Sequence, residues 1–130
     1  MNTQGKYVKL VSKLNRLTKE DKLAWSVCKP PKALREGVDA IWIDFYSTVY
    51  AGTELGIGEM RFRSYSDYAD GINWEQRPVL SLLEDHELKY EFPKIEGLWN
   101  LLETIRYKEA DVEDTIESLI GAPDEDEHEE

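Results

Sequence analysis

The N-terminal segment of the chain carries hydrophobic residues at the spacing of one helix face. From Tyr7 to Leu17 they recur every three or four positions, and lysine or arginine side chains lie between them. This interval matches the turn of an α-helix, so the pattern predicts a first helix. Residues 23–28 instead place their larger hydrophobic side chains at alternate positions, which predicts a short strand that ends before Pro30 and Pro31.

The middle of the chain has the alternation and the composition of β-strands. Residues 38–50 are rich in β-branched and aromatic side chains and predict a long strand. Its odd positions are hydrophobic and are expected to face the core, whereas its even positions form an amphipathic face. The two sets are Ile41, Ile43, Phe45 and Val49, and Trp42, Asp44, Tyr46, Thr48 and Tyr50. Residues 53–65 predict the returning strand of a hairpin, in which Gly56 and Gly58 indicate a bulge or a close backbone approach.

The C-terminal half predicts a second hairpin and two helices. Residues 66–77 lack a consistent period and are expected to form an exposed connection. Residues 79–92 then alternate on both sides of an acidic turn at 84–86, which is typical of a half-buried hairpin. Hydrophobic residues keep helical spacing over 95–105. They do so again over 111–121, where an aspartate is placed to cap the helix and a glycine to end it.

The order of these elements predicts an α+β fold. We expect an N-terminal helix, a four- to five-stranded and mostly antiparallel sheet, and two C-terminal helices packed on one face of that sheet. The 130 residues have room for one domain, to which we assign residues 1–121. Residues 122–130 are expected to form a disordered acidic tail, because the last seven positions hold six carboxylates and no hydrophobic group.

The charge of the chain narrows the classes of partner. The formal net charge is -11, and the body stays negative without the acidic tail. A surface of this sign repels phosphate groups and anionic lipids and attracts cationic surfaces, so we expect no direct contact with nucleic acid or membrane. The single Cys28 excludes an internal disulfide and favours the reducing cytoplasm. The sequence leaves the oligomeric state open.

Few residues are candidates for catalysis. His86 and His128 are the only histidines, and no nucleophile pairs with either in the sequence. The acidic neighbours of His86 are more typical of a solvated turn than of a metal site. Cys28 is next to the cation Lys29, which favours a thiolate, but a small structural cysteine explains the position better. We therefore assign no catalytic residue and favour a protein that is not an enzyme.

The segment from Asp67 to Glu75 contains the oxygen side chains and the glycine of a calcium-binding loop. Ser66 and Tyr68 occupy positions where an EF-hand needs acidic or amide side chains, so the segment does not fit that motif. The glycines of residues 52–58 are not followed by the lysine of a phosphate-binding loop. We expect neither a metal nor a cofactor.

The same segment combines hydrophobic side chains with carboxylates. Aromatic anchors surrounded by polar groups are typical of protein-binding surfaces; the alternative is that Trp74 folds back as a lid over the core. With the acidic turn before His86 included, the predicted partner-binding residues are Asp67, Tyr68, Asp70, Ile72, Trp74, Glu75, Glu84 and Asp85.

The chain is acidic and has no recognisable set of catalytic residues, and this combination predicts a protein that acts by binding another protein. We expect a non-catalytic protein that binds and inhibits or restrains a protein partner with a basic surface. Small acidic α+β proteins of this kind include immunity proteins, antitoxins and phage-encoded inhibitors, and mimicry of nucleic acid is one variant. The alternative is a small-molecule-binding protein or enzyme, with a pocket between the sheet and the C-terminal helices that Trp42, Tyr46 and Arg61 or Arg63 enter. A structural subunit of a larger assembly is the third hypothesis.

Overall fold

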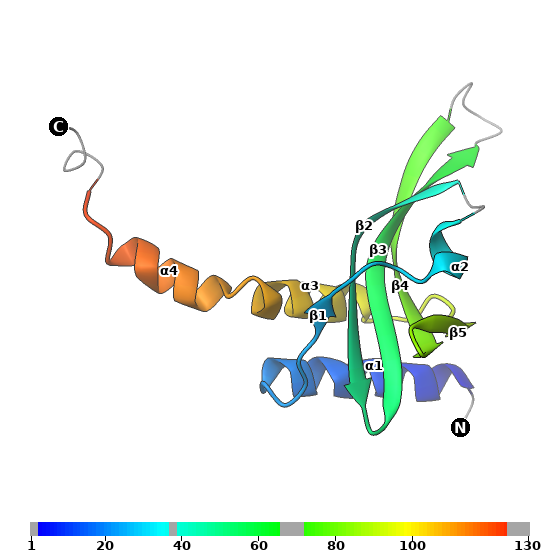
Figure 1. Ribbon diagram of the computed structural model, residues 1–130, viewed down its shortest axis with the longest axis horizontal. Helices are drawn as coiled ribbons and strands as arrows, with labels where there is room; N and C mark the ends of the chain where they lie inside the picture. The colour runs from blue at the N-terminus through cyan, green and yellow to red at the C-terminus, as the bar shows by residue number, and fades with distance from the viewer. Residues whose placement is uncertain (1–2, 37–38, 66–71, 125–130) are drawn as a thin grey trace.

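The computed structural model describes residues 3–36, 39–65 and 72–124, and it confirms the α+β fold (Figure 1). The helices are α1 (Thr3–Lys19), α2 (Lys32–Arg35), α3 (Leu98–Glu109) and α4 (Val112–Ile120). The strands are β1 (Ser26–Val27), β2 (Ala40–Tyr50), β3 (Thr53–Tyr65), β4 (Ile72–Glu84) and β5 (Glu87–Glu91). The short helix α2 was not predicted, because its single turn leaves no period in the sequence.

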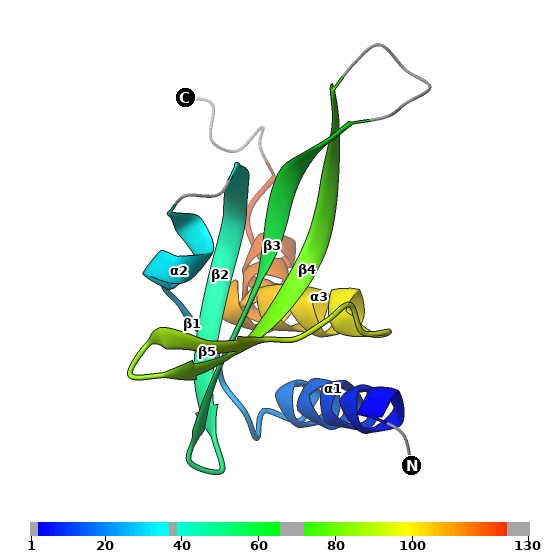
Figure 2. The ribbon, with the colours of Figure 1, turned by 90° about the vertical axis from the view of Figure 1, so that its right-hand side faces the viewer.

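The five strands form one antiparallel sheet in which sequence neighbours are spatial neighbours. Their order is β1-β2-β3-β4-β5, and each pair runs antiparallel. Helices α1 and α3 lie side by side across one face, and α2 lies against the other (Figure 2). Helices α1 and α3 cover only the part of the sheet near the β2–β3 turn (Figure 2). The opposite half of β2, β3 and β4 therefore extends beyond them, and we call it the distal half (Figure 2).

The main core lies between the sheet and the two helices α1 and α3. Its largest fully buried side chains from these elements are Leu14, Ile57, Leu80, Leu98, Leu101, Leu102 and Ile105. Burying a side chain of this size contributes about 1.5–3 kcal/mol, so this layer supplies much of the stability. Trp25 closes the layer at the end of α1, where its indole N–H donates to the hydroxyl of Thr18 at 3.0 Å. That hydroxyl in turn donates to the carbonyl of Leu14 at 2.7 Å, so the polar side-chain atoms of Trp25 and Thr18 are paired.

The predicted orientation of β2 is wrong. Tyr46, an even position, is only 7% exposed and packs against the main core. The odd positions Ile41, Ile43 and Val49 are 52%, 47% and 66% exposed, and only Phe45 of that set is buried. A β-bulge between Trp42 and Asp44 adds one residue and changes which positions share a face. Alternation defines two faces, but only the packing of the helices decides which face becomes the core.

A second, smaller core lies on the opposite face, under α2. Phe45 is buried there with Leu34 and Leu83. The predicted close approach at the two glycines of β3 is confirmed on this side. A Cβ atom on Gly58 would overlap the backbone oxygen of Asp44, and one on Gly56 would lie 2.5 Å from the ring of Phe45. The ring of Phe45 therefore occupies the space that side chains at these two positions would take.

Both predicted C-terminal helices are present, but they differ in packing. Helix α3 lies on the sheet, whereas α4 points away from the body of the protein and has no buried residue (Figure 1). Asp111 occupies the predicted cap position in a left-handed conformation, with φ of 52°, and makes no side-chain capping hydrogen bond. Of the predicted tail, residues 122–124 are exposed and residues 125–130 lie outside the described part. No described helix is long and apolar enough to cross a membrane.

Candidate functional site

The predicted partner-binding residues that the structure describes do not lie in one patch. Asp67, Tyr68 and Asp70 lie outside the described residues. The remaining ones are spread along β4 and its following turn, from Ile72 at one end to Glu84 at the other. A strand rises about 3.3 Å per residue, so Trp74 and Glu84 are roughly 33 Å apart. Any binding surface that uses the distal half is separate from one at the β4–β5 turn.

Trp74 does not fold over the core. Its side chain is 48% exposed on the distal half of the sheet, where the guanidinium of Arg63 lies 5.4 Å from the centre of its ring. Glu75 is exposed and points to the opposite face, because its cross-strand partner is Phe62 rather than Arg63. The aromatic side chain and the carboxylate that sequence reasoning placed together are thus on different sides of the sheet.

The β4–β5 turn holds His86 in a structural role. Asp85 and His86 both have positive φ angles, 54° and 63°. The backbone N–H of His86 donates to Glu54 at 2.9 Å, and its ring Nε2 lies 2.9 Å from the carbonyl oxygen of Lys29. A carbonyl only accepts, so Nε2 carries the hydrogen. These contacts tie the turn to β3 and to the segment before α2.

A partly buried ionic cluster that was not predicted joins α3 to the sheet. Arg106 on α3 donates from Nε to Asp44 Oδ2 at 2.7 Å and from its terminal nitrogen to Glu59 Oε1 at 2.6 Å. The hydroxyl of Tyr46 donates to the same carboxylate of Asp44 at 3.1 Å. Arg106 and Asp44 are 62 positions apart, so no local spacing could have indicated the pair.

The pKa values in this cluster follow from burial and pairing. Burial by itself raises the pKa of Asp44, but the hydrogen bonds and the positive charge of Arg106 outweigh it and hold that pKa below its ordinary value. The hydrogen bond to Asp44 raises the pKa of Arg106, which stays charged. Burial, followed by the charge of Asp44, raises the pKa of Tyr46. Asp44 therefore stays negative, Arg106 positive and Tyr46 neutral, which keeps their hydrogen bonds intact. These charge states are typical of a structural salt bridge rather than of a site of proton transfer.

The predicted location of a ligand pocket, between the sheet and the C-terminal helices, is filled. Tyr46 is buried there among side chains of α3, and the ionic cluster occupies the edge of the same layer. Trp42 faces the other side, where its indole N–H donates to the carbonyl of Leu34 at 2.9 Å. Arg61 and Arg63 lie on the distal half of β3, beyond the helices. These four side chains do not surround one space.

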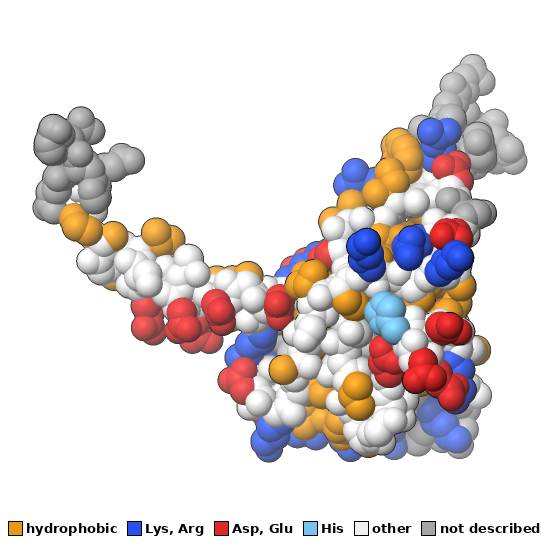
Figure 3. All heavy atoms as spheres, in the orientation of Figure 1, with side chains coloured by type: hydrophobic (Ala, Val, Ile, Leu, Met, Phe, Trp, Pro, Cys, Tyr) orange, Lys and Arg blue, Asp and Glu red, His pale blue; other side chains and the backbone are white. Residues whose placement is uncertain are grey.

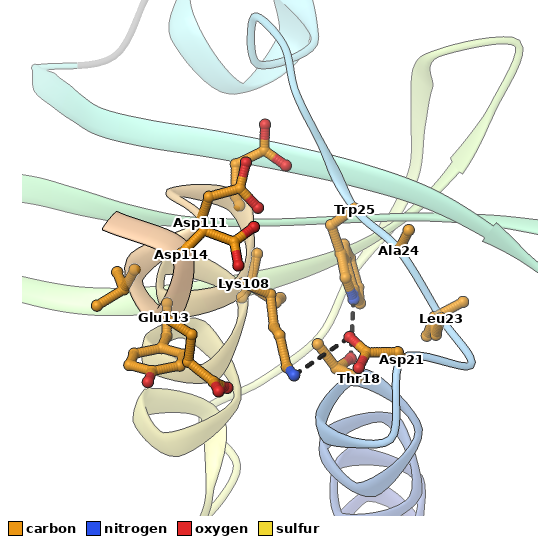
Figure 4. Close-up of a pocket in the computed structure, with 13 residues that line it drawn as sticks. Thr18, Asp21, Leu23, Ala24, Trp25, Lys108, Asp111, Glu113 and Asp114 are labelled. Carbon is orange, nitrogen blue, oxygen red and sulfur yellow. Dashed lines mark hydrogen bonds and ion pairs between the residues drawn. The ribbon is translucent and has the colours of Figure 1, made fainter. Parts of the chain in front are cut away.

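A different hollow, of about 510 Å³, opens where α1, α3 and α4 meet (Figure 4). The last turn of α1, the segment before β1 and the junction of α3 with α4 form its walls. Its hydrophobic lining includes Trp25, Ile105 and Val112. Its charged lining consists of Asp21, Lys108, Glu109, Asp111, Glu113 and Asp114. We call this hollow the acidic pocket, because five of those six side chains are carboxylates.

One of the five carboxylates is already paired. Lys108 Nζ lies 3.2 Å from Asp21 Oδ1 across the mouth of the pocket (Figure 4). Asp111, Glu113 and Asp114 are exposed and form no ion pair with any residue that the structure describes. Among the described residues, no three side chains of the types that bind metals are arranged to hold an ion. The pocket therefore offers unpaired negative charge next to hydrophobic wall.

Comparison of the chain with protein-family models, with curated proteins and with solved structures gives no match. No residue role can be transferred from a relative.

Proposed function

We propose that this protein is a non-catalytic interaction protein that binds a protein partner through the partner's basic surface. The acidic pocket carries this proposal. Three of its unpaired carboxylates, Asp111, Glu113 and Asp114, come from one turn at the start of α4 and line the same hollow as Trp25 (Figure 4). An arginine or lysine side chain of the partner would fit this space.

The shape of the pocket favours a long cationic side chain over a free ion. Lysine and arginine carry three or four methylene groups before the charge, and such stems pack along hydrophobic surface while the charged end reaches polar groups. Trp25, Ile105 and Val112 provide that surface. Charge-assisted hydrogen bonds to carboxylates are about twice as strong as neutral ones, and they gain further where the walls exclude part of the water.

The net charge of the whole chain supports the same kind of partner. A net charge of -11 attracts a basic surface over several ångströms and raises the rate of encounter. Basic surfaces on intracellular proteins commonly serve to bind the phosphates of nucleic acids. Covering such a surface inhibits or restrains the partner, which is the activity that we propose. Mimicry of nucleic acid is the variant in which the carboxylates occupy phosphate positions.

The proposal is tested by capturing the partner from the native host and repeating the capture with two matched variants. The first variant is Asp111→Asn with Asp114→Asn, in the acidic pocket. The second is Glu84→Gln with Asp85→Asn, in the turn that sequence reasoning selected. Each removes two carboxylates, and each contains one residue at positive φ where asparagine is tolerated.

We expect the pocket variant to bind the captured partner about tenfold or more weakly, because close charge pairs at interfaces couple strongly. The turn variant should keep its affinity, and added salt should weaken the binding of both. The reverse order would assign the binding to the β4–β5 turn. If neither pair of substitutions nor salt changes the affinity, the partner is not recognised through its basic surface and the proposal fails.

A further inference from the structure

Helix α4 presents a hydrophobic stripe that no described residue of its own chain covers. Ile116, Leu119 and Ile120 are 45%, 69% and 79% exposed. With 3.6 residues per turn, these three and Val112 fall on one side of the helix, and Glu113 and Glu117 border that side along one edge. In Figure 3 hydrophobic side chains follow the upper edge of α4, toward the distal half of the sheet, and acidic ones follow the lower edge. A short amphipathic helix in this position needs a partner surface to stay ordered.

The distal half of the sheet presents a second exposed surface. It lies on the same face of the sheet as α3, beyond the part that α3 covers. Asp44 and Glu59 mark this side, because they bond Arg106 of α3. Cross-strand partners share a face, so the residues that continue it beyond α3 follow from the register. They are Ile41, Arg61 and Gln76 in one row, and Arg63 and Trp74 in the next. We call them the distal sheet face.

The two surfaces are complementary in both polarity and charge. The distal sheet face combines exposed hydrophobic side chains, Ile41 and Trp74, with the cations Arg61 and Arg63. The stripe of α4 combines hydrophobic side chains with a border of carboxylates. A helix lying on this face would bury its stripe and place its acidic border next to the arginines, which is the helix-in-groove mode of recognition.

We propose that the occupant of the distal sheet face is helix α4 of a second copy of this chain, so that two copies exchange their α4 helices in a symmetric dimer. In this structure α4 extends away from the body on one side and the distal half of the sheet extends away on another (Figure 3). Helix α4 therefore does not lie on the distal sheet face of its own chain. In a two-fold dimer each chain contributes one helix and one sheet face, so the contact is made twice. Val112 and Glu113 border both surfaces, but Ile116, Leu119, Ile120 and the distal sheet face lie outside the acidic pocket, so the dimer can be tested without the partner.

The first test measures self-association by sedimentation velocity over a range of concentrations at physiological ionic strength, where the general repulsion between acidic chains is screened. The unchanged chain is expected to dimerise. Ile116→Asp with Leu119→Asp should abolish the dimer, because two charges would enter the contact. The matched control, Thr115→Asp with Ser118→Asp, adds the same two charges outside the stripe and should leave the dimer intact. All four positions are on α4, which has no buried residue, so the fold itself should be unaffected.

The second test exchanges the charges of the two surfaces. Arg61→Glu with Arg63→Glu forms one variant, and Glu113→Arg with Glu117→Arg forms the other. Alone, each should dimerise about tenfold or more weakly, because like charges would meet in both contacts. Mixed in equal amounts, they should form a heterodimer, since each glutamate-bearing sheet face then meets an arginine-bearing helix, and each unchanged sheet face meets an unchanged helix.

Three results would overturn the proposal. A chain that stays monomeric at about 100 µM has no useful self-affinity, whatever the state of α4. A dimer that survives the stripe substitutions uses another surface. A dimer that the charge exchange weakens but that the mixture does not restore does not bring α4 and the distal sheet face together. Because none of these results depends on the partner or on Asp111 and Asp114, failure here is distinguishable from failure of the proposed function.

Discussion

At the scale of single residues, Arg106 connects α3 to two strands of the sheet. It bonds two carboxylates from different strands, and both carboxylates are mostly buried. The cluster also extends across the sheet: with its amide oriented to suit its neighbours, Gln76 donates to Glu59 at 3.2 Å and accepts from Arg61 at 2.9 Å. A buried charge that loses its partner is far more costly than a paired one, so this arginine holds α3 in position rather than simply adding one more bond.

Replacing Arg106 by Met should therefore lower the free energy of unfolding by about 3 kcal/mol or more, because Asp44 and Glu59 would face each other without a cation. Urea unfolding measures the change. The control is Arg16→Met, which removes an exposed i,i+4 pair with Glu20 and should cost less than about 1 kcal/mol. Adding Asp44→Asn and Glu59→Gln to the Arg106 variant should restore part of the loss. Equal effects of the two single substitutions would show that the cluster is no stronger than a surface ion pair.

At the scale of elements, the two C-terminal helices show how one sequence signal leads to different packing. Both have hydrophobic residues at helical spacing. In α3 these residues are buried against α1 and the sheet, whereas in α4 they remain exposed. The break between the helices lies at Ala110 and Asp111, where the left-handed conformation of the aspartate turns the chain away from the body. Periodicity indicates that a helix has an apolar side but does not identify the surface that will cover it.

Removal of α4 should leave the body of the protein folded. A chain that ends at Ala110 loses no buried side chain, so its free energy of unfolding should stay within about 0.5 kcal/mol of the full chain. The comparison is made at low micromolar concentration, where self-association through α4 is small. A chain that ends at Pro93 is the matched control and should not fold, because α3 supplies Leu98, Leu101 and Leu102 to the core. A large loss of stability on removing α4 alone would contradict its unpacked position.

At the scale of the whole molecule, acidity acts on stability in two opposite ways. The net charge of -11 at neutral pH produces general repulsion within the folded chain, and protonation toward the isoelectric point near 4.7 relieves it. The Asp44 carboxylate has the opposite dependence. Its folded-state pKa lies below the ordinary value, so its contribution is complete above the unfolded pKa and disappears as the pH falls through the folded one.

Stability should therefore rise as the pH is lowered from 7 toward about 5, and then fall below about 4, where Asp44 of the unfolded chain takes up a proton first. Thermal unfolding followed at a series of pH values gives the profile. In Asp44→Asn the overall stability should be lower, and the fall below pH 4 should be shallower, because one depressed carboxylate is gone. A profile that falls steadily from pH 7 downward would show that general repulsion is negligible in this chain.

The sequence by itself indicated the longer helices and strands, their order and the α+β class, because helix and strand periods and turn residues act over a few positions. It missed the short helix α2, and it wrongly assigned residues 72–77, which form the first part of β4, to an exposed connection. It also indicated the close backbone approach at Gly56 and Gly58 and the position of His86 in a turn. Only the tertiary structure decided which face of β2 meets the helices, since the bulge at Asp44 and the placement of α1 and α3 choose between two faces that alternation leaves equivalent. The Arg106 cluster, the acidic pocket and the exposed stripe of α4 were likewise decided in three dimensions, because each depends on segments distant in the chain being brought together or kept apart.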